Sequence, residues 1–294
     1  MTIAITGASG FVGAHVVQAL AANGETLVAV GRRQPVSLPK GVRFVELDLA
    51  DATSEDYDRM GRPDMLVHLA WDGLPNYLSL HHFEEQLPLQ YRFLKSMVEG
   101  GLGAMVVTGT CFEYGMINGE LSEDAITLPD NPYAYAKCAL LRELQFLKAK
   151  RPFDLTWARL FYMHGPGQAK TSIYPLLQAA IRRGDSKFPM SGGEQLRDYL
   201  PIEQVGRHLA DLARLRVDAG IVNVSSGSPV SIRRLVESWV KDAGSSIELE
   251  LGAYGYPSYE PFSFWGSAAK RKSLLDTFGE SDCDHPAFVN GQKS

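Results

Sequence analysis

Residues 2–13 read TIAITGASGFVG, a short apolar run that ends in a turn with three glycines, Gly7, Gly10 and Gly13. The apolar spacing of residues 11–24 then predicts a helix that an Asn-Gly pair closes. A glycine turn between a strand and a helix lets the backbone approach an anion, and free N–H groups at the helix start favour negative charge. The spacing G-x-x-G-x-x-G is a variant of the dinucleotide fingerprint. It predicts a phosphate-binding loop, and a plain tight turn is the alternative.

Further apolar runs alternate with helical patterns along the chain. Strands are expected at residues 26–30, 42–47, 64–70, 104–110, 154–160 and 220–227, and helices within 77–99, where Pro88 is a candidate kink, and from residue 132. Alternating strands and helices predict an α/β, Rossmann-type fold with a doubly wound parallel sheet. Residues 1–160 are expected to form the dinucleotide-binding domain, joined by the strand near 220–227. Residues 161–280 would form a smaller, interleaved C-terminal substrate-binding lobe, and residues 281–294 a tail.

Composition excludes several classes of function. The 294 residues carry a net charge of −5 without long runs of one sign, which disfavours nucleic acid or an anionic membrane as partner. The three cysteines share no metal-ligand spacing, so no metal site is expected and free thiols are the simplest interpretation. The first residues do not resemble a signal peptide, and no apolar run reaches the length of a membrane span. We expect a cytoplasmic protein.

The end of the second strand bears on the choice of cofactor. Sites for NAD commonly place an acid there, whereas this chain has Gly31 followed by Arg32 and Arg33. Two guanidinium groups can pair with a 2′-phosphate, so the turn favours NADP(H), with NAD(H) as the alternative and a solvated basic turn as the plain explanation. Asp48, after the third strand, could hydrogen-bond adenine or cap a helix.

A tyrosine and a lysine carry the candidate chemistry. In a helix that begins near Pro132, Tyr133 and Lys137 are four residues apart and share a face, whereas Tyr135 points nearly the opposite way. A nearby ammonium should lower the pKa of the Tyr133 phenol from about 10, so that it can exchange a proton with a carbinol oxygen beside a nicotinamide. Thr110 ends the fifth strand at the edge where ligands bind and can hold that oxygen. An amphipathic helix with an incidental pair is the alternative.

With these motifs in place, the chain resembles the extended short-chain dehydrogenases/reductases of the NDP-sugar epimerase/dehydratase/reductase group. TGASGFVG is similar to the group's TGxxGxxG, TGTCFEYG to its serine-rich strand that ends in Tyr-Gly, and PYAYAK to its YxxxK. ARLFYMHGPGQ resembles its R-x-F-N-x-Y-G-P turn, and LRDYLPIEQV its R-D-[FY]-x-x-[IV]-x-D-[VA] segment. The matches follow the order of the family over most of residues 1–230.

The resemblance implies a catalytic set, an NDP-sugar substrate and a homodimer that pairs the helices near 77–99 and 133–149. The catalytic set is Thr110, Tyr133 and Lys137, with Lys137 also on the nicotinamide ribose, and Arg197 is expected near the diphosphate. The expected cofactor contacts are Gly7, Gly10, Phe11, Val12, Gly13, Arg32, Arg33, Asp48, Leu49, Leu69, Ala70, Lys137 and Phe161. The expected substrate contacts are Trp71, Thr110, Glu113, Tyr133, Tyr162 and Arg197.

Departures from the family pattern narrow the reaction. The 4,6-dehydratases of the family place an Asp-Glu pair after the threonine, where this chain has Cys111 and Phe112, so dehydration is disfavoured. Epimerase-reductases of the GDP-fucose synthase type need a Cys and a His as proton shuttles. Cys111 is one position away from that cysteine, so a buried thiol and a turn histidine at His164 are the favoured interpretation.

Three further positions concern the sugar. Tyr162 replaces the usual asparagine and indicates an altered sugar or nucleotide pocket, and Trp71 replaces a small residue and should narrow the sugar site. Glu113 could hydrogen-bond sugar hydroxyls or be solvated.

Hydride exchange at a sugar carbon remains. The first hypothesis is reduction of a 4-keto-6-deoxy NDP-sugar, and the second is a 4-epimerase with tightly bound NAD. The third, a non-catalytic dinucleotide sensor, is disfavoured because such modules typically lose the tyrosine or the lysine.

Overall fold

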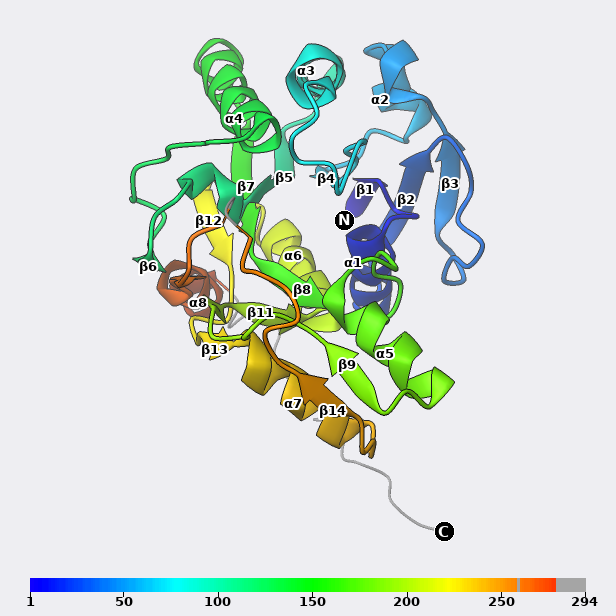
Figure 1. The fold of residues 1–294 in the computed structure, drawn as a ribbon. Coiled ribbons are helices and arrows are strands. Elements are labelled where there is room, and N and C mark those ends of the chain that lie inside the picture. Colours follow the sequence, from blue (N-terminus) through cyan, green and yellow to red (C-terminus); the bar gives the residue numbers. More distant parts are fainter. Residues whose placement is uncertain (258–259, 279–294) are drawn as a thin grey trace.

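A computed structural model describes residues 1–257 and 260–278 of the chain. Its centre is a seven-stranded sheet in the order β3-β2-β1-β4-β5-β7-β12, and every pairing in it is parallel (Figure 1). The strands are β1 (Thr2–Thr6), β2 (Thr26–Gly31), β3 (Arg43–Glu46), β4 (Met65–His68), β5 (Ala104–Thr110), β7 (Asp154–Leu160) and β12 (Gly220–Val224). The expected α/β, Rossmann-type fold with a parallel sheet is confirmed.

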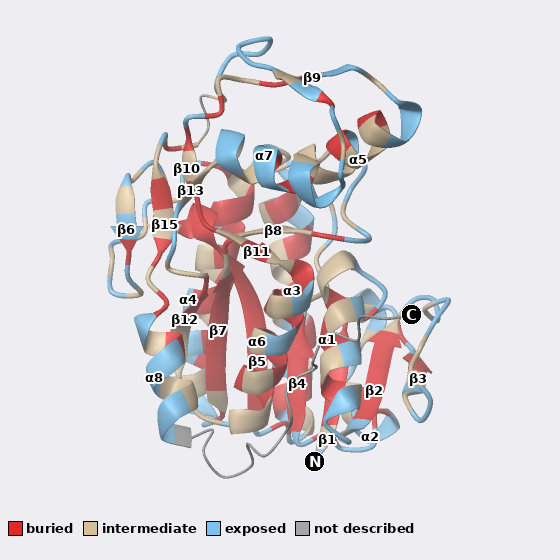
Figure 2. Ribbon diagram, turned by 90° about the horizontal axis from the view of Figure 1, so that it is seen from below, coloured by how far each residue is buried: buried red, intermediate tan, exposed pale blue. Residues whose placement is uncertain are grey.

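Helices cover both faces of this sheet. The long helices α1 (Phe11–Ala22) and α6 (Ile202–Leu215) lie on one face, and α3 (Leu87–Gly100) and α4 (Pro132–Lys150) on the other (Figure 1). The inner strands of the sheet are buried on both sides, as Figure 2 shows, so most of their residues are apolar, and polar side chains such as Thr110 and Arg159 are buried among them.

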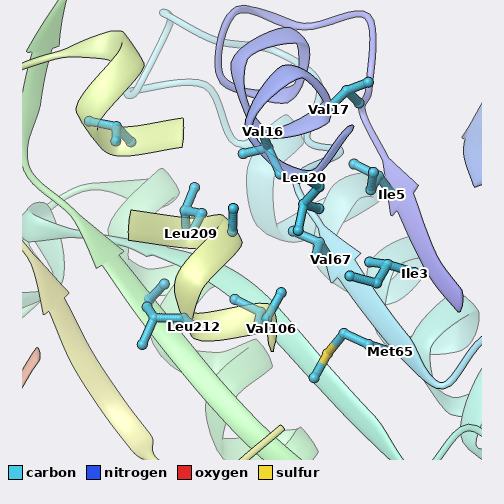
Figure 3. Close-up of a cluster of buried hydrophobic side chains, with 14 of the residues drawn as sticks. Ile3, Ile5, Val16, Val17, Leu20, Met65, Val67, Val106, Leu209 and Leu212 are labelled. Carbon is cyan, nitrogen blue, oxygen red and sulfur yellow. The ribbon is translucent and has the colours of Figure 1, made fainter. Parts of the chain in front are cut away.

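Side chains of one strand alternate between the two faces. Ile3 and Ile5 pack with Leu20 of α1 and Leu209 of α6, whereas Ala4 belongs to the cluster under α3 and α4 (Figure 3). The two apolar clusters hold the sheet between its helices, and this fixes where the strand ends lie.

Shorter elements complete the chain. They are α2 (Glu55–Arg59), a π-helical turn (His82–Gln86), 3-10 turns at Leu49–Asp51 and Cys111–Tyr114, and α8 (Ala269–Phe278). Small two-stranded sheets pair β6 (Gly119–Leu121) with β15 (Phe264–Gly266), β8 (Tyr162–His164) with β11 (Tyr199–Pro201), β9 (Lys187–Pro189) with β14 (Glu248–Glu250), and β10 (Leu196–Arg197) with β13 (Val230–Ser231).

A third, smaller apolar cluster lies outside the main sheet. Helices α5 (Ile173–Arg183) and α7 (Ile232–Asp242) pack there with β9, and Leu177, Phe188, Val236 and Trp239 are among its buried members. Strand β7 leads through β8 into this part of the chain, so the segment that forms this cluster follows the carboxyl end of a central strand.

Several expected elements differ in extent: the strands expected at 42–47 and 64–70 are shorter by a residue or two at their ends, and two others differ more. The helix expected within 77–99 begins with the π-helical turn, which runs directly into α3, and Pro88 lies just after the junction of the two. The strand expected over 220–227 stops at Val224, because the N–H groups of Ser226 and Gly227 donate to the Asp198 carboxylate instead. The expected tail falls on residues outside the described chain.

Candidate active site

The three glycines of the first turn are required for different reasons. Gly7 has φ +71°, and a Cβ there would lie 2.8 Å from the backbone nitrogen of Ala70. A Cβ at Gly13 would overlap the carbonyl oxygen of Gly7, so this glycine permits the close approach of helix and strand. A Cβ at Gly10 would meet only that same oxygen, at 3.2 Å, and Gly10 borders two cavities. The backbone at Gly10 is therefore open to a ligand, as a phosphate loop requires.

Two cavities meet at this turn. One, of about 490 Å³, contains the candidate catalytic side chains, and we call it the tyrosine cavity. The other, of about 290 Å³, contains Arg32 and is called the arginine cavity. Gly7, Gly10, Leu69 and Trp71 line both. Two adjoining cavities joined at a glycine loop suit the two halves of a dinucleotide.

Most of the expected cofactor residues line one of these cavities. Gly7, Gly10, Phe11, Val12, Gly13, Leu69, Lys137 and Phe161 line the tyrosine cavity, and Gly7, Gly10, Arg32, Asp48, Leu49, Leu69 and Ala70 line the arginine cavity. Arg33 is the exception, because it is not among the lining residues. The Asp48 side chain caps the following 3-10 turn by accepting from Ala50 N at 3.0 Å, and it still borders the cavity.

The first turn of α4 brings the candidate acid and base groups into the tyrosine cavity. Asn131 caps this helix by accepting from Ala134 N at 2.9 Å. Tyr133 and Lys137 are both buried on one face, whereas the Tyr135 side chain is 54% exposed, as the helical spacing predicts. Lys137 Nζ donates to the carbonyl oxygen of residue 108 at 2.8 Å. Thr110, at the end of β5, lines the same cavity, so the three expected catalytic groups converge.

The electrostatics of this group differ from the sequence expectation. Burial lowers the pKa of Lys137 to about 7, although the charge of Glu113 opposes the shift. Burial raises the pKa of Tyr133 above its ordinary 10, and a hydrogen bond with Thr110 only partly opposes this. The expected lowering of the Tyr133 pKa is therefore wrong for the protein alone. The reason is that both groups are desolvated and the ammonium faces the ring of Trp71, 3.9 Å from its centroid.

Glu113 does not face the substrate side. It is 0% exposed, and its Oε2 lies 2.7 Å from Arg159 Nε in an ion pair. Trp157 Nε1 donates to the same carboxylate at 3.0 Å, and the Thr110 backbone N–H donates to it at 2.9 Å. A Cβ at Gly109 would overlap both the indole nitrogen and the carboxylate. Both expectations for Glu113, a sugar contact and a solvated side chain, are wrong, because its charge is used to hold the end of β5.

Arg197 also lies outside the lining of both cavities. Its guanidinium donates to Glu260 Oε2 at 2.9 Å and to the carbonyl oxygens of Leu196 and Phe262. It lies 5.6 Å from the ring centroid of Tyr162, which does line the tyrosine cavity. In this arrangement the charge of Arg197 is satisfied by Glu260 and not directed to a diphosphate.

The wall of the tyrosine cavity includes residues that were not among the expected cofactor or substrate contacts. Leu74, Pro75 and Tyr77 come from the loop after β4, and Phe112 comes from the turn after β5. The Tyr133 backbone N–H donates to the Tyr77 carbonyl oxygen at 3.2 Å, so this loop is bonded to the first turn of α4. The available signal was the position of the loop, because ligands of open parallel sheets bind at loops that follow the strands.

The lining also limits the chemistry. No Asp or Glu lines the tyrosine cavity within residues 1–257 and 260–278, so elimination lacks an acid–base pair of carboxylates. Cys111 lines it, and burial raises the pKa of this thiol, which stays neutral. His164 instead packs against Trp239, with centroids 4.8 Å apart and ring planes tilted by 51°, so a Cys–His shuttle is not assembled.

Two negative findings hold for the described part of the chain. None of its His, Cys, Asp and Glu side chains form a group of three that could hold a metal ion. None of its helices has the length and apolarity needed to cross a membrane.

Comparison with known proteins gives a consistent picture. The model of the NAD dependent epimerase/dehydratase family matches residues 3–224. The chain is 28% identical over 271 residues to the dTDP-6-deoxy-L-talose 4-dehydrogenase (NAD(+)) of Aggregatibacter actinomycetemcomitans. The aligned region covers 91% of this chain and 100% of that protein. It is 24% identical over 304 residues to a UDP-glucose 4-epimerase of Halalkalibacterium halodurans, with 94% and 90% covered.

A solved structure agrees with these relatives. MoeE5 in complex with UDP-glucuronic acid and NAD superposes with a TM-score of 0.80 at 28% identity, over 94% of this chain and 93% of that one. Dehydrogenases and epimerases are both among these relatives. The similarity therefore indicates the cofactor and substrate classes of the group and does not single out one reaction. The family match over residues 3–224 agrees with the glycine loop and with the convergence of Thr110, Tyr133 and Lys137. The chain therefore belongs to the NAD dependent epimerase/dehydratase family of NDP-sugar enzymes.

Proposed function

We propose that this protein is a nicotinamide-dependent oxidoreductase that interconverts a ketone and a carbinol at C4 of an NDP-linked 6-deoxyhexose, acting as a reductase of the 4-keto-6-deoxy sugar. The observation that carries the proposal is the convergence of Thr110, Tyr133 and Lys137 on one cavity beside the glycine loop. The 28% identical relative named for 4-dehydrogenation of dTDP-6-deoxy-L-talose supports the same carbon and the same kind of sugar.

The protonation states support the reducing direction. When bound, the nicotinamide supplies or accepts the hydride. Reduction of a ketone also needs a proton donor at the oxygen, and burial keeps the Tyr133 phenol protonated by raising its pKa. The Thr110 hydroxyl can hold the same oxygen. Lys137, in its charged form, stabilises the phenolate that remains after the proton has left.

The wall of the cavity supports a 6-deoxy sugar. Leu74, Pro75, Tyr77 and Phe112 present apolar or aromatic surface, and Lys137 is the one Lys or Arg side chain among the described lining residues. A C6 methyl group fits such a wall. A C6 carboxylate would be desolvated there without a guanidinium partner, which is costly.

For the cofactor, we propose a preference for NADP(H) over NAD(H). Arg32 lines the arginine cavity, and the neighbouring position at the end of β2 is Gly31, which carries no acid to repel a 2′-phosphate. The relative from Aggregatibacter is named for NAD(+), and MoeE5 was solved with NAD. Arg32 is therefore the residue on which this preference depends.

We also propose a homodimer that pairs α3 and α4 of two copies. Tyr135 and Phe146, both on α4, are 54% and 60% exposed, which is unusual for large aromatic side chains on one helix. Burial of these rings against a second copy would remove apolar surface from water.

The proposed reaction is tested with purified protein, a dTDP- or UDP-linked 4-keto-6-deoxyhexose, and NADPH or NADH. We expect loss of reduced nicotinamide in equal amount to a product that has gained two hydrogens, measured by absorbance and mass spectrometry. Isomerisation of an NDP-hexose without net change in nicotinamide would establish the 4-epimerase instead. Tight dinucleotide binding without turnover of either sugar type would favour the sensor.

A further inference from the structure

Trp71 has an unusual place in the site. It follows β4 and lines both cavities, at the boundary between them. The Lys137 ammonium lies 3.9 Å from the centroid of the indole ring, within the range of a cation–π contact. Nζ also donates a hydrogen bond to the carbonyl oxygen of residue 108, and the Tyr133 ring centroid lies farther away, at 5.9 Å. The indole ring therefore covers one side of the ammonium. No carboxylate of the described chain forms an ion pair with this ammonium.

The indole is itself held in place. Trp71 Nε1 donates to His82 Nδ1 at 3.0 Å, and the other ring nitrogen of His82 lies 2.8 Å from the Asn76 carbonyl oxygen. These two bonds require a neutral imidazole that accepts at Nδ1 and donates from Nε2. His82 is fully buried and burial lowers its pKa, which favours the neutral form. A chain of contacts thus runs from the loop after β4 through His82 to the ammonium.

We propose that Trp71 is a positioning residue for Lys137: its indole face keeps the buried ammonium charged and directed at the boundary of the two cavities, and the hydrogen bond to His82 fixes the angle of the ring. A buried lysine without an anionic contact otherwise tends to lose its proton. A desolvated indole attracts a cation more strongly than other aromatic rings do. The consequence for turnover rests on the proposed function, whereas the effect on Lys137 itself does not.

The other groups around Lys137 leave room for this role. His68, on β4, is buried and its pKa is lowered to about 3, so it is neutral. His82 is neutral by the argument above, and burial keeps Tyr133 protonated. Glu113, in the turn after β5, favours the charged amine, but it is already paired with Arg159. The indole is thus the aromatic surface in direct contact with the ammonium.

The test measures the protonation of Lys137 directly. Protein labelled with ¹³C-lysine is titrated by NMR, and the Lys137 Cε signal is assigned by its loss in Lys137→Met. Tryptophan is replaced biosynthetically by mono-, di- and trifluorinated analogues, which withdraw electron density from the ring at nearly constant shape. We expect the Lys137 pKa to fall with each added fluorine, and to fall by about one unit, a tenfold change in the protonation constant, when Trp71→Leu removes the ring.

The matched control is the same fluorinated series in Trp71→Phe. There the dependence on fluorine should vanish, although the three other tryptophans still carry the label, because the fluorinated ring next to Lys137 is absent. A Lys137 pKa that is the same in all fluorinated proteins and in Trp71→Leu would overturn the inference. If the shift is found but no keto-sugar is reduced, the proposed function fails and the inference stands. If the sugar is reduced, the basic limb of the kcat–pH profile should move with the NMR value, and an unmoved profile would count against the positioning role.

Discussion

Replacing Glu113 by Ala should destabilise the fold strongly, although Glu113 lies one turn from Thr110, a proposed catalytic residue. The substitution leaves the Arg159 guanidinium, 1% exposed, without its carboxylate, and removes the acceptor of Trp157 Nε1 and of the Thr110 N–H. Breaking a buried pair from one side costs about 3–5 kcal/mol. Each kcal/mol shifts Tm by about 2 °C in a chain of this size, so we expect a decrease of roughly 6–10 °C.

The assay is thermal unfolding followed by circular dichroism, with calorimetry as a second measure. Asp58→Ala is the matched control, because it removes a carboxylate from the exposed 2.7 Å pair with Arg62 and should leave Tm unchanged. The double replacement Glu113→Leu with Arg159→Met should recover much of the lost stability, since neither charge is then stranded. A Glu113→Ala protein that melts like the wild type, but has a raised KM for the sugar, would refute the buried-pair argument and restore a substrate contact.

The other predictions concern the site and its surroundings. Tyr133→Phe should lower kcat at least a hundredfold and leave dinucleotide affinity nearly unchanged in calorimetric titration, because it removes only the proton donor; full activity would exclude Tyr133 from the mechanism. Arg32→Ala should weaken the binding of NADPH about tenfold or more and that of NADH much less. An equal loss of affinity for both would contradict the 2′-phosphate contact. Below pH 7, Lys137→Met should have a larger free energy of unfolding than the wild type, because folding of the variant buries no cation. Denaturant titrations should show this difference in the free energy of unfolding shrinking as pH rises from about 7 to 10.5. Phe146→Glu should convert a dimer into a monomer in light scattering, and unchanged mass would place the dimer contact elsewhere.

Local patterns were sufficient for the frame of the site. The glycine turn at Gly7 and Gly10, the strand that ends at Thr110, and the helical spacing of Tyr133 and Lys137 each follow from a short stretch of chain. Parallel strands then bring these stretches to one edge of the sheet. The convergence of the three side chains was therefore predictable before any contact was known.

The partners of buried charges were not predictable in this way. Glu113 pairs with Arg159, 46 residues away, and Arg197 with Glu260, 63 residues away. No local periodicity reports such pairings, so a buried carboxylate and a substrate-facing one look alike in sequence. The predicted direction of the Tyr133 pKa shift was wrong for a related reason. Desolvation of the buried phenol outweighs the neighbouring cation, and the sequence does not show how deeply the phenol is buried.

The hydrogen bond from the Tyr133 N–H to the Tyr77 carbonyl has a bearing on how specificity can change. The loop proposed to contact the sugar is hydrogen-bonded to the helix turn that carries Tyr133, the proposed acid. Replacing this loop by that of a relative should therefore alter the rate together with the substrate preference. Substitutions of single side chains, such as Leu74, leave this backbone hydrogen bond in place. New sugars should therefore be accessible to laboratory evolution through point changes in the wall sooner than through insertions or deletions.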